Sequence, residues 1–230
     1  MFEEPLAFSS DQFSGFARVF PLPNLVMFPH VMQAVHIFEP RYQALLEAAV
    51  EDDRLIALGV HVAGWQKDYE GRPPLRPMAC LCRVATHQRT PEGTYNVLLL
   101  GVRRLRLVAE MPPSQPFRMF EAEIMEEHEP EQAVPGMATE LQQKLLAAFK
   151  RAMPKMPAAY DQLDQLLGSQ ITLGVLADIV SYTLDLDVEW KMRLLGECDV
   201  FRRTSMLLEA MAGRPTAGQR RPFPPQFSIN

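Results

Sequence analysis

The stretch "FPLPNLVMFPHVMQAVHIFEPRY", residues 20–42, decides how the first half of this chain folds. It carries almost no charge until its last residues, and prolines at positions 21, 23, 29 and 40 cut it into short pieces. Proline has no N–H to give to a sheet ladder, so it sits at the ends or edges of strands. A small barrel made of short strands tolerates this pattern, whereas a long flat sheet does not.

Two strands are predicted in and around this stretch. Residues 18–22 form the first, which ends at Pro23, and residues 33–38 form a further one. Side chains alternate between the two faces of such a strand. In the second strand one face carries Ala34, His36 and Phe38, and the other carries Val35 and Ile37.

A helix is predicted directly after these strands. Pro40 suits the first turn of a helix, because its missing N–H costs nothing there. Apolar residues then recur at positions i, i+3, i+4 and i+7, which places one stripe against a core. The stripe consists of Tyr42, Leu45, Leu46 and Ala49.

The strand pattern continues to about residue 130. Residues 55–62 form an aliphatic, buried strand, and residues 63–78 form a long loop. Strands starting at residue 79 and at Tyr95 make a hairpin around the turn Pro91-Glu92-Gly93. The apolar residues change face at Gly101, which predicts a bulge or bend. A last strand carries Phe120, Ala122 and Ile124 on one face.

The second half of the chain is predicted to be helical. A first stripe, which Pro154 terminates, contains Leu141, Leu145, Ala148 and Phe149, and a short second one contains Leu163, Leu166 and Leu167. Three later helices have polar residues suited to the N-cap, namely Thr172, Asp187 and Asp199. Gly213 is the expected C-cap of the last helix.

These patterns predict an α+β protein in several parts. The expected parts are an N-terminal extension at 1–17, a β-barrel with one inserted helix at 18–130, a helical subdomain at 137–213 and a tail rich in proline and arginine at 214–230.

The totals exclude several classes of protein. The 230-residue chain has a net charge of -5, so no strong positive field attracts it to nucleic acid or anionic lipid. We recognise neither an export signal nor an uncharged run of about 18 apolar residues. Three cysteines, Cys80, Cys82 and Cys198, give no disulfide framework. We therefore expect a cytoplasmic protein without membrane attachment.

No catalytic motif is recognisable. The sequence has no phosphate-binding loop, dinucleotide fingerprint or nucleophile elbow. The five histidines are scattered, and Cys80 and Cys82 are too close together for the usual zinc knuckle. The acidic run at 123–131 is expected to be a solvated strand exit rather than a general acid/base pair. We expect no enzyme activity, no cofactor and no metal.

Aromatic residues in loops are the candidates for binding. The chain has 13 Phe and 13 Met, adaptable side chains that suit varied apolar partners, although most of them are expected in the core. An aromatic residue in a loop does not easily reach the core, and an exposed apolar patch marks a binding site. The residues expected to contact a polypeptide are Phe28, His30, Trp65 and Tyr69.

Two segments resemble the N-terminal domain of Lon proteases. In residues 20–60, a P-L-x-x-x-V-x-F-P opening is matched by Pro21, Leu22, Val26, Phe28 and Pro29. His30 stands where that family often has glycine. In "ACLCRVATHQRTPEGTYNVLLLGVRRLRLV" the family's hairpin motif is matched by Pro91, Gly93, Val97, Gly101 and Arg104, with Ala79 where glycine is common. The resemblance is specific over residues 18–128 and weaker through the helices to residue 212.

The resemblance implies a PUA-like β pseudobarrel followed by an all-α helical bundle. In Lon this region holds unfolded or tagged polypeptides and helps to assemble the oligomer. Neither the ATPase nor the peptidase domain fits in this chain, so it resembles a stand-alone substrate-binding domain of the kind common in bacteria. The implied partners are unfolded polypeptides or a protein partner, a protease among them, bound in an apolar groove between barrel and helices. The sequence predicts no oligomeric state.

Two other functions stay open on the sequence. A PUA-like module could bind RNA through a basic patch at Arg103, Arg104 and Arg106, although the negative net charge argues against nucleic acid. A hydrolase could assemble its site from residues far apart in the chain, which a pocket with strongly perturbed titratable groups would reveal.

Overall fold

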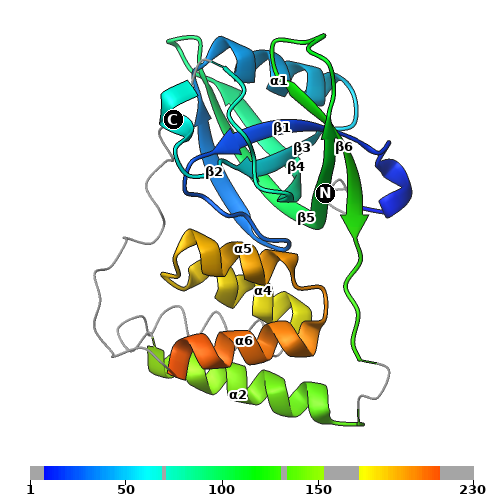
Figure 1. Cartoon of the computed structure of the whole chain (residues 1–230), viewed down its shortest axis with the longest axis vertical. Helices are drawn as coiled ribbons and strands as arrows, with labels where there is room; N and C mark the ends of the chain where they lie inside the picture. Colours follow the sequence, from blue (N-terminus) through cyan, green and yellow to red (C-terminus); the bar gives the residue numbers. More distant parts are fainter. Residues whose placement is uncertain (1–7, 69–70, 131–133, 153–170, 213–230) are drawn as a thin grey trace. The chain divides into compact units, whose positions relative to one another are not determined.

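The computed structural model describes residues 8–68, 71–130, 134–152 and 171–212 (Figure 1). These residues divide into two compact units, with the boundary between Glu126 and Glu127. The first is a barrel unit and the second is a helical unit. The fold is α+β, as the sequence predicts. No helix among the described residues is long and apolar enough to cross a membrane.

Five of the described strands close into a ring in the barrel unit. They are β1 (Phe16–Leu22), β3 (Leu55–Val60), β4 (Met78–Arg89), β5 (Tyr95–Glu110) and β6 (Arg118–Met125), in the order β5-β4-β3-β1-β6, with β6 returning to β5. β1 and β3 run parallel, and the other neighbours in the ring are antiparallel. The small closed sheet predicted from the proline-cut stretch is therefore confirmed.

β2 (Met32–Ile37) lies outside this ring. It pairs antiparallel with the first part of β5, from Tyr95 to Leu100, while the later part of β5 pairs with β6. The 16-residue strand β5 therefore belongs to the ring and also supports the additional strand.

The interior of the barrel is filled by aliphatic and aromatic side chains from all five strands. This core consists of Ala17, Val19, Leu55, Ala57, Ala79, Leu81, Val102, Leu105, Leu107, Phe120 and Ala122. Phe8 and Phe13, from the segment before β1, pack against its edge. A short 3-10 helix, η1 (Ser10–Gln12), connects these two residues. This described part of the N-terminal segment is thus attached to the barrel.

The helix α1 (Pro40–Glu51) packs against the outside of β1 and β3 (Figure 1). Its buried residues are the four of the predicted stripe, Tyr42, Leu45, Leu46 and Ala49. The Tyr42 ring lies 4.6 Å from the Phe20 ring, centroid to centroid. Proline at the first position and the i, i+3, i+4, i+7 spacing were sufficient to predict this helix.

The bulge predicted at Gly101 is confirmed. In the β4–β5 ladder Leu81 pairs with Arg103 and Cys82 pairs with Gly101, which leaves Val102 without an opposite residue. A Cβ atom on Gly101 would lie 2.1 Å from the carbonyl oxygen of Phe28, so only glycine allows this approach. The Gly101 N–H donates to the Val31 carbonyl at 2.9 Å, which fixes the segment between β1 and β2 on the barrel.

The helical unit contains α2 (Met137–Ala152), α4 (Leu173–Thr183), α5 (Val188–Gly196) and α6 (Val200–Ala212). The three predicted N-caps are confirmed. Thr172 Oγ1 accepts from the Val175 N–H, Asp187 from that of Trp190, and Asp199 from those of Phe201 and Arg202. The stripe predicted at 163–167, the C-cap at residue 213 and the tail at 214–230 lie outside the described residues.

All three cysteines are free thiols. Cys80 and Cys82 are buried in the barrel unit, and Cys198 is half-buried in the helical unit.

Candidate functional site

The exposed face of β2 brings together two of the exposed large hydrophobic side chains of the barrel unit. Met32 is 49% exposed and Phe38, just past the end of the strand, is 37% exposed. Ala34 and His36 lie between them on the same face, while Val35 and Ile37 point inward and are buried. The alternation predicted from the sequence is confirmed. We call Met32, Ala34, His36 and Phe38 the β2 face.

Two leucines of β5 extend this surface. Leu98 lies opposite Ala34 and Leu100 lies opposite Met32, and both are half-buried. Residues directly opposite in antiparallel strands share one face, so their side chains continue the apolar surface sideways. The surface can bind an apolar side chain from another molecule, because burying it there removes water from both partners.

One polar contact crosses the β2 face. His36 Nδ1 lies 2.8 Å from Asn96 Oδ1, and the His36 ring stacks on Phe38 with 6.2 Å between centroids. This contact fixes the orientation of His36 and holds the Phe38 ring beside the strand.

The outer edge of β2 is only partly available for pairing with a further strand. Among the described strands, β2 pairs only with β5. However, the side chain of Gln33 donates to the carbonyl of Ala34, so this backbone acceptor is already used. Contacts through side chains are therefore favoured on this strand over the addition of a full partner strand.

The expectation that Phe28 lies exposed in a loop is wrong. Its side chain is 0% exposed, although the segment around it is neither helix nor strand. The Phe28 carbonyl lies against Gly101, so the loop is packed on the sheet and its aromatic residue fills the core. His30, two residues later, is exposed and has a φ of 63°, which is the left-handed region that glycine adopts most easily. This backbone conformation gives a physical reason for the glycine that often stands at the matching position of the family that the segment resembles.

Trp65 lies half-buried at the start of η2 (Trp65–Asp68), and Tyr69 lies outside the described residues. The Trp65 ring stacks on the imidazole of His61 at 5.0 Å and an angle of 14°. Burial of His61, together with the positive charges of Arg118 and Arg41, lowers the pKa of its imidazole to about 4. His61 is therefore neutral at neutral pH, and its imidazole gives the Trp65 ring a flat, uncharged surface to stack on.

The three arginines of the predicted basic patch do not form one surface. Arg104 is 1% exposed. Arg103 is half-buried, with its guanidinium 5.3 Å from the centre of the Phe8 ring. Arg106 is exposed but forms an ion pair with Glu123. The geometry therefore provides no continuous row of exposed cations from these three residues.

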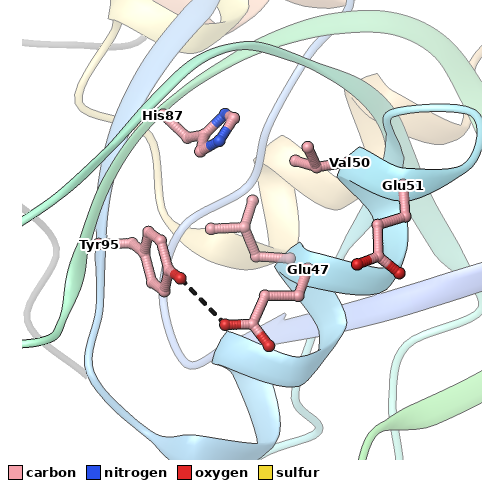
Figure 2. Close-up of a pocket in the computed structure, with 6 residues that line it drawn as sticks. Glu47, Val50, Glu51, His87 and Tyr95 are labelled. Atoms are coloured by element: carbon pink, nitrogen blue, oxygen red, sulfur yellow. Dashed lines mark hydrogen bonds between the residues drawn. The ribbon is translucent and has the colours of Figure 1, made fainter.

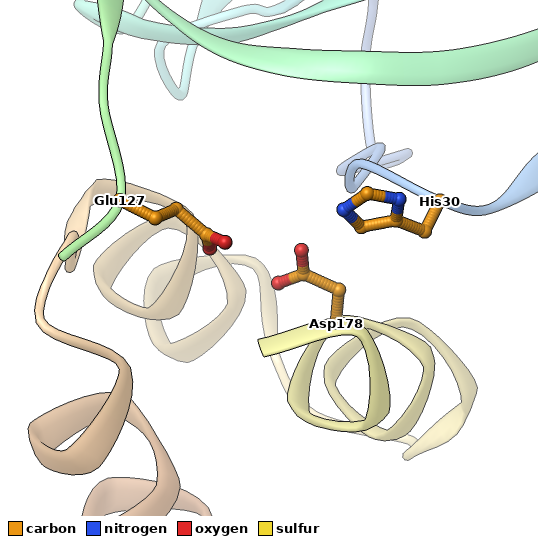
Figure 3. Close-up of side chains that lie close together, drawn as sticks. All are labelled: His30, Glu127 and Asp178. Atoms are coloured by element: carbon orange, nitrogen blue, oxygen red, sulfur yellow. The ribbon is translucent and has the colours of Figure 1, made fainter. Parts of the chain in front are cut away.

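A buried ionic network in the helical unit was not predicted. Arg203 and Asp178 are both 0% exposed, and Arg203 Nε lies 3.4 Å from Asp178 Oδ1. Arg203 also pairs with Glu127 and donates to the Glu197 carbonyl at 2.7 Å. Figure 3 shows the carboxylates of Glu127 and Asp178 pointing toward each other. The network joins the start of the unit to α4 and α6, and we assign it a structural role.

Comparison with known proteins identifies relatives of most of the chain. The family profile described as "ATP-dependent protease La (LON) substrate-binding domain" matches residues 17–213. A Lon protease 2 from Myxococcus xanthus is 26% identical over 194 residues, which cover 84% of this chain and 23% of that protein. A Lon protease from Paraburkholderia phytofirmans is 28% identical over 200 residues, which cover 84% of this chain and 24% of that protein. The chain thus spans about a quarter of the length of these relatives.

Solved structures of Lon N-terminal domains share the fold. The N-terminal domain of Mycobacterium avium complex Lon protease has a TM-score of 0.65 and 18% identity, with coverage of 87% of this chain and 100% of that one. A Lon N-terminal domain protein from Xanthomonas campestris has a TM-score of 0.62 and 18% identity, with coverage of 87% and 99%.

Proposed function

The chain belongs to the ATP-dependent protease La (LON) substrate-binding domain family, and from this premise we propose that it binds segments of unfolded polypeptides without catalysing a reaction. The binding surface is the β2 face, with Leu98 and Leu100 beside it. The observation that carries this proposal is the exposure of Met32 on β2 and of Phe38 just past its end, because β2 has a partner on one side only among the described strands.

The chemistry of the β2 face suits unfolded chains of varied sequence. Met32 is unbranched and polarisable, so it can pack against different apolar side chains. Phe38 offers an aromatic ring whose orientation is held by His36. Complete burial of such a side chain contributes about 1.5–3 kcal/mol, and both are already partly buried, so each is expected to contribute about 1 kcal/mol. This supports weak and general binding rather than strict recognition.

His30 and Trp65 are further contacts in this proposal. His30 is exposed two residues before β2, and Trp65 presents an aromatic ring on the neutral imidazole of His61. Tyr69 keeps the role predicted from the sequence. Phe28 contributes indirectly, because its burial fixes the segment that carries His30.

The wider context is also a proposal. Three free thiols suit a reducing compartment, and we assign the protein to the cytoplasm. The family suggests a protease as the partner. The protein would deliver the bound chains to this protease. No step of this role requires a reaction at the β2 face.

Fluorescence anisotropy with a labelled, permanently unfolded protein tests the proposal. The double variant Met32→Ser, Phe38→Ser is expected to raise the Kd about thirtyfold, because about 1 kcal/mol of apolar burial is lost at each position. Val108→Ser is the matched control, since Val108 is also 49% exposed and lies on the later part of β5. An unchanged Kd in the double variant, with the fold intact by circular dichroism, would contradict the proposal.

A further inference from the structure

A small pocket lies between α1 and the β4–β5 hairpin (Figure 2). Its volume is about 120 Å³, enough for about four water molecules or one extended side chain. It is lined by Leu46, Glu47, Val50, Glu51, His87 and Tyr95. Tyr95 and His87 lie on the face of the hairpin that also carries buried Val97, and this face is opposite to the β2 face. The pocket is therefore a separate feature of the barrel unit.

The pocket combines an apolar wall with two carboxylates. Leu46 and Val50 come from the border of the buried stripe of α1, and Glu47 and Glu51 follow them on the exposed side. Figure 2 shows the Tyr95 hydroxyl directed at Glu47, to which it donates at 3.0 Å. This hydrogen bond raises the pKa of Tyr95 and holds the Glu47 carboxylate at the pocket.

The two glutamates carry like charges one helical turn apart. Carboxylates at positions i and i+4 of a helix repel each other, so a cation placed between them is stabilised by both. On the hairpin side, the guanidinium of Arg89 lies 5.9 Å from the centre of the Tyr95 ring. Arg89 is not among the residues that line the pocket. His87 is the remaining titratable group in the lining.

We propose that this pocket takes the side chain of a lysine or arginine from a bound polypeptide. The aliphatic part of the side chain would lie on Leu46 and Val50, and its charged end would lie between Glu47 and Glu51. Long basic side chains bury their methylene groups on apolar surface while the charge stays in water, which suits a small pocket with an apolar wall and carboxylates beside it. An acidic or phosphorylated side chain would meet two carboxylates and is excluded by repulsion.

This inference rests on the proposed function and makes it more specific. The β2 face selects apolar side chains of any shape, whereas the pocket adds a preference for segments that also carry a basic residue. With such a preference the protein would bind acidic, strongly solvated segments weakly and would favour chains that are both apolar and basic.

Two synthetic peptides that differ only in the ammonium group of one side chain test the inference. One contains an apolar sequence with a central lysine, and the other has norleucine, which has the same aliphatic stem without the charge. Two exposed charge pairs are worth little each, so the lysine peptide is expected to bind about three- to tenfold more tightly to the native chain. In Glu47→Gln, Glu51→Gln this preference should disappear, while binding of the norleucine peptide stays unchanged.

Glu121→Gln is the matched control, because Glu121 is an exposed glutamate on β6 of the same unit and lies outside the pocket lining. It should retain the full preference for lysine. Equal binding of the two peptides to the native chain would overturn the inference, as would a lysine preference that survives in the double glutamine variant. Absence of any binding by either peptide would also overturn it.

The outcome separates the two proposals. Loss of norleucine-peptide binding in the Met32→Ser, Phe38→Ser variant reports on the β2 face alone. A lysine preference that persists in that variant supports the pocket even if the β2 face fails. Chemical shifts of Tyr95 and His87 during titration with the lysine peptide provide a second readout, and unshifted signals for both residues would count against the pocket.

Discussion

The two units of this protein differ in which side chains they expose and which they bury. The barrel unit exposes two apolar side chains, Met32 on a strand outside the closed ring and Phe38 just past the end of that strand. The helical unit buries charges, with Arg203 and Asp178 both fully inside. Exposed apolar surface costs stability and serves binding, whereas a buried ion pair contributes little net stability but makes the packing intolerant of losing one partner. The network in the helices therefore has a structural role, whereas the exposed apolar surface of the barrel is the one that we propose as a binding surface.

Each unit also carries one of the two tryptophans, Trp65 in the barrel and Trp190 in α5. Fluorescence of single-tryptophan variants, with the other tryptophan replaced by phenylalanine, can therefore follow the two units separately during unfolding by urea. This gives a direct way to test whether the two environments behave differently.

The largest expected effect is on the helical unit. Asp178→Ala leaves the Arg203 charge buried without this carboxylate, so the free energy of unfolding reported by Trp190 should fall by about 3–5 kcal/mol. The Trp65 transition should stay in place. Asp185→Ala, at an exposed aspartate of the same unit, should change neither transition. An equal shift of both tryptophan signals would mean that the units unfold together and would break the comparison.

The reverse experiment acts on the barrel. Gly101→Ala places a methyl group 2.1 Å from the Phe28 carbonyl, and forcing the segment away should lower the free energy of unfolding seen by Trp65 by about 3 kcal/mol. Gly15→Ala serves as the control. Gly15 has a φ of 89° with open space around it, so only backbone strain of about 1 kcal/mol is expected there. A Gly101 effect no larger than the Gly15 effect would show that the close approach is not needed.

The smallest expected effect is a dependence of the stability of the barrel on pH, which comes from His61. His61 has a pKa of about 4 in the folded barrel and 6.5 as its ordinary value, so the unfolded chain takes up the proton first as the pH falls. Above pH 6.5 the group should have no influence. Between pH 6.5 and pH 4 the full difference in pKa corresponds to about 3 kcal/mol, and the barrel should lose about 2 kcal/mol of this, because the imidazole is only partly removed from water. Urea titrations read at Trp65 measure this loss. In His61→Phe the dependence should flatten, and an unchanged pH profile in that variant would exclude His61 as its cause.

The local features of the fold could be predicted from the sequence, because each depends on residues close together in the chain. The stripe from Tyr42 to Ala49, the caps at Thr172 and Asp187 and the bulge at Gly101 follow from spacing and from side-chain chemistry. The alternation of the β2 face follows from the period of two in a strand.

Features that depend on distant contacts were missed or misjudged. Phe28 follows no periodic pattern, and only its approach to Gly101 explains why a loop residue is fully buried. Arg203 directly follows the exposed Arg202 in the sequence, and no pattern there predicts that it is buried. Its burial depends on Asp178, which α4 brings next to it in the fold. The pocket at Glu47 joins residues 48 positions apart, a distance over which no periodic pattern extends. The signal that was present is the pair Glu47 and Glu51, one turn apart beside the buried stripe.

The different burial of the three thiols makes the native chain a convenient object for spectroscopy. Reagents that attack thiolates reach exposed sulfur much faster than buried sulfur, so a maleimide dye should react at Cys198 and spare Cys80 and Cys82. One acceptor fluorophore would then be attached to the helical unit without any substitution. Energy transfer from Trp65 to that dye, in a chain with Trp190 replaced, would report on the distance between the two units in solution.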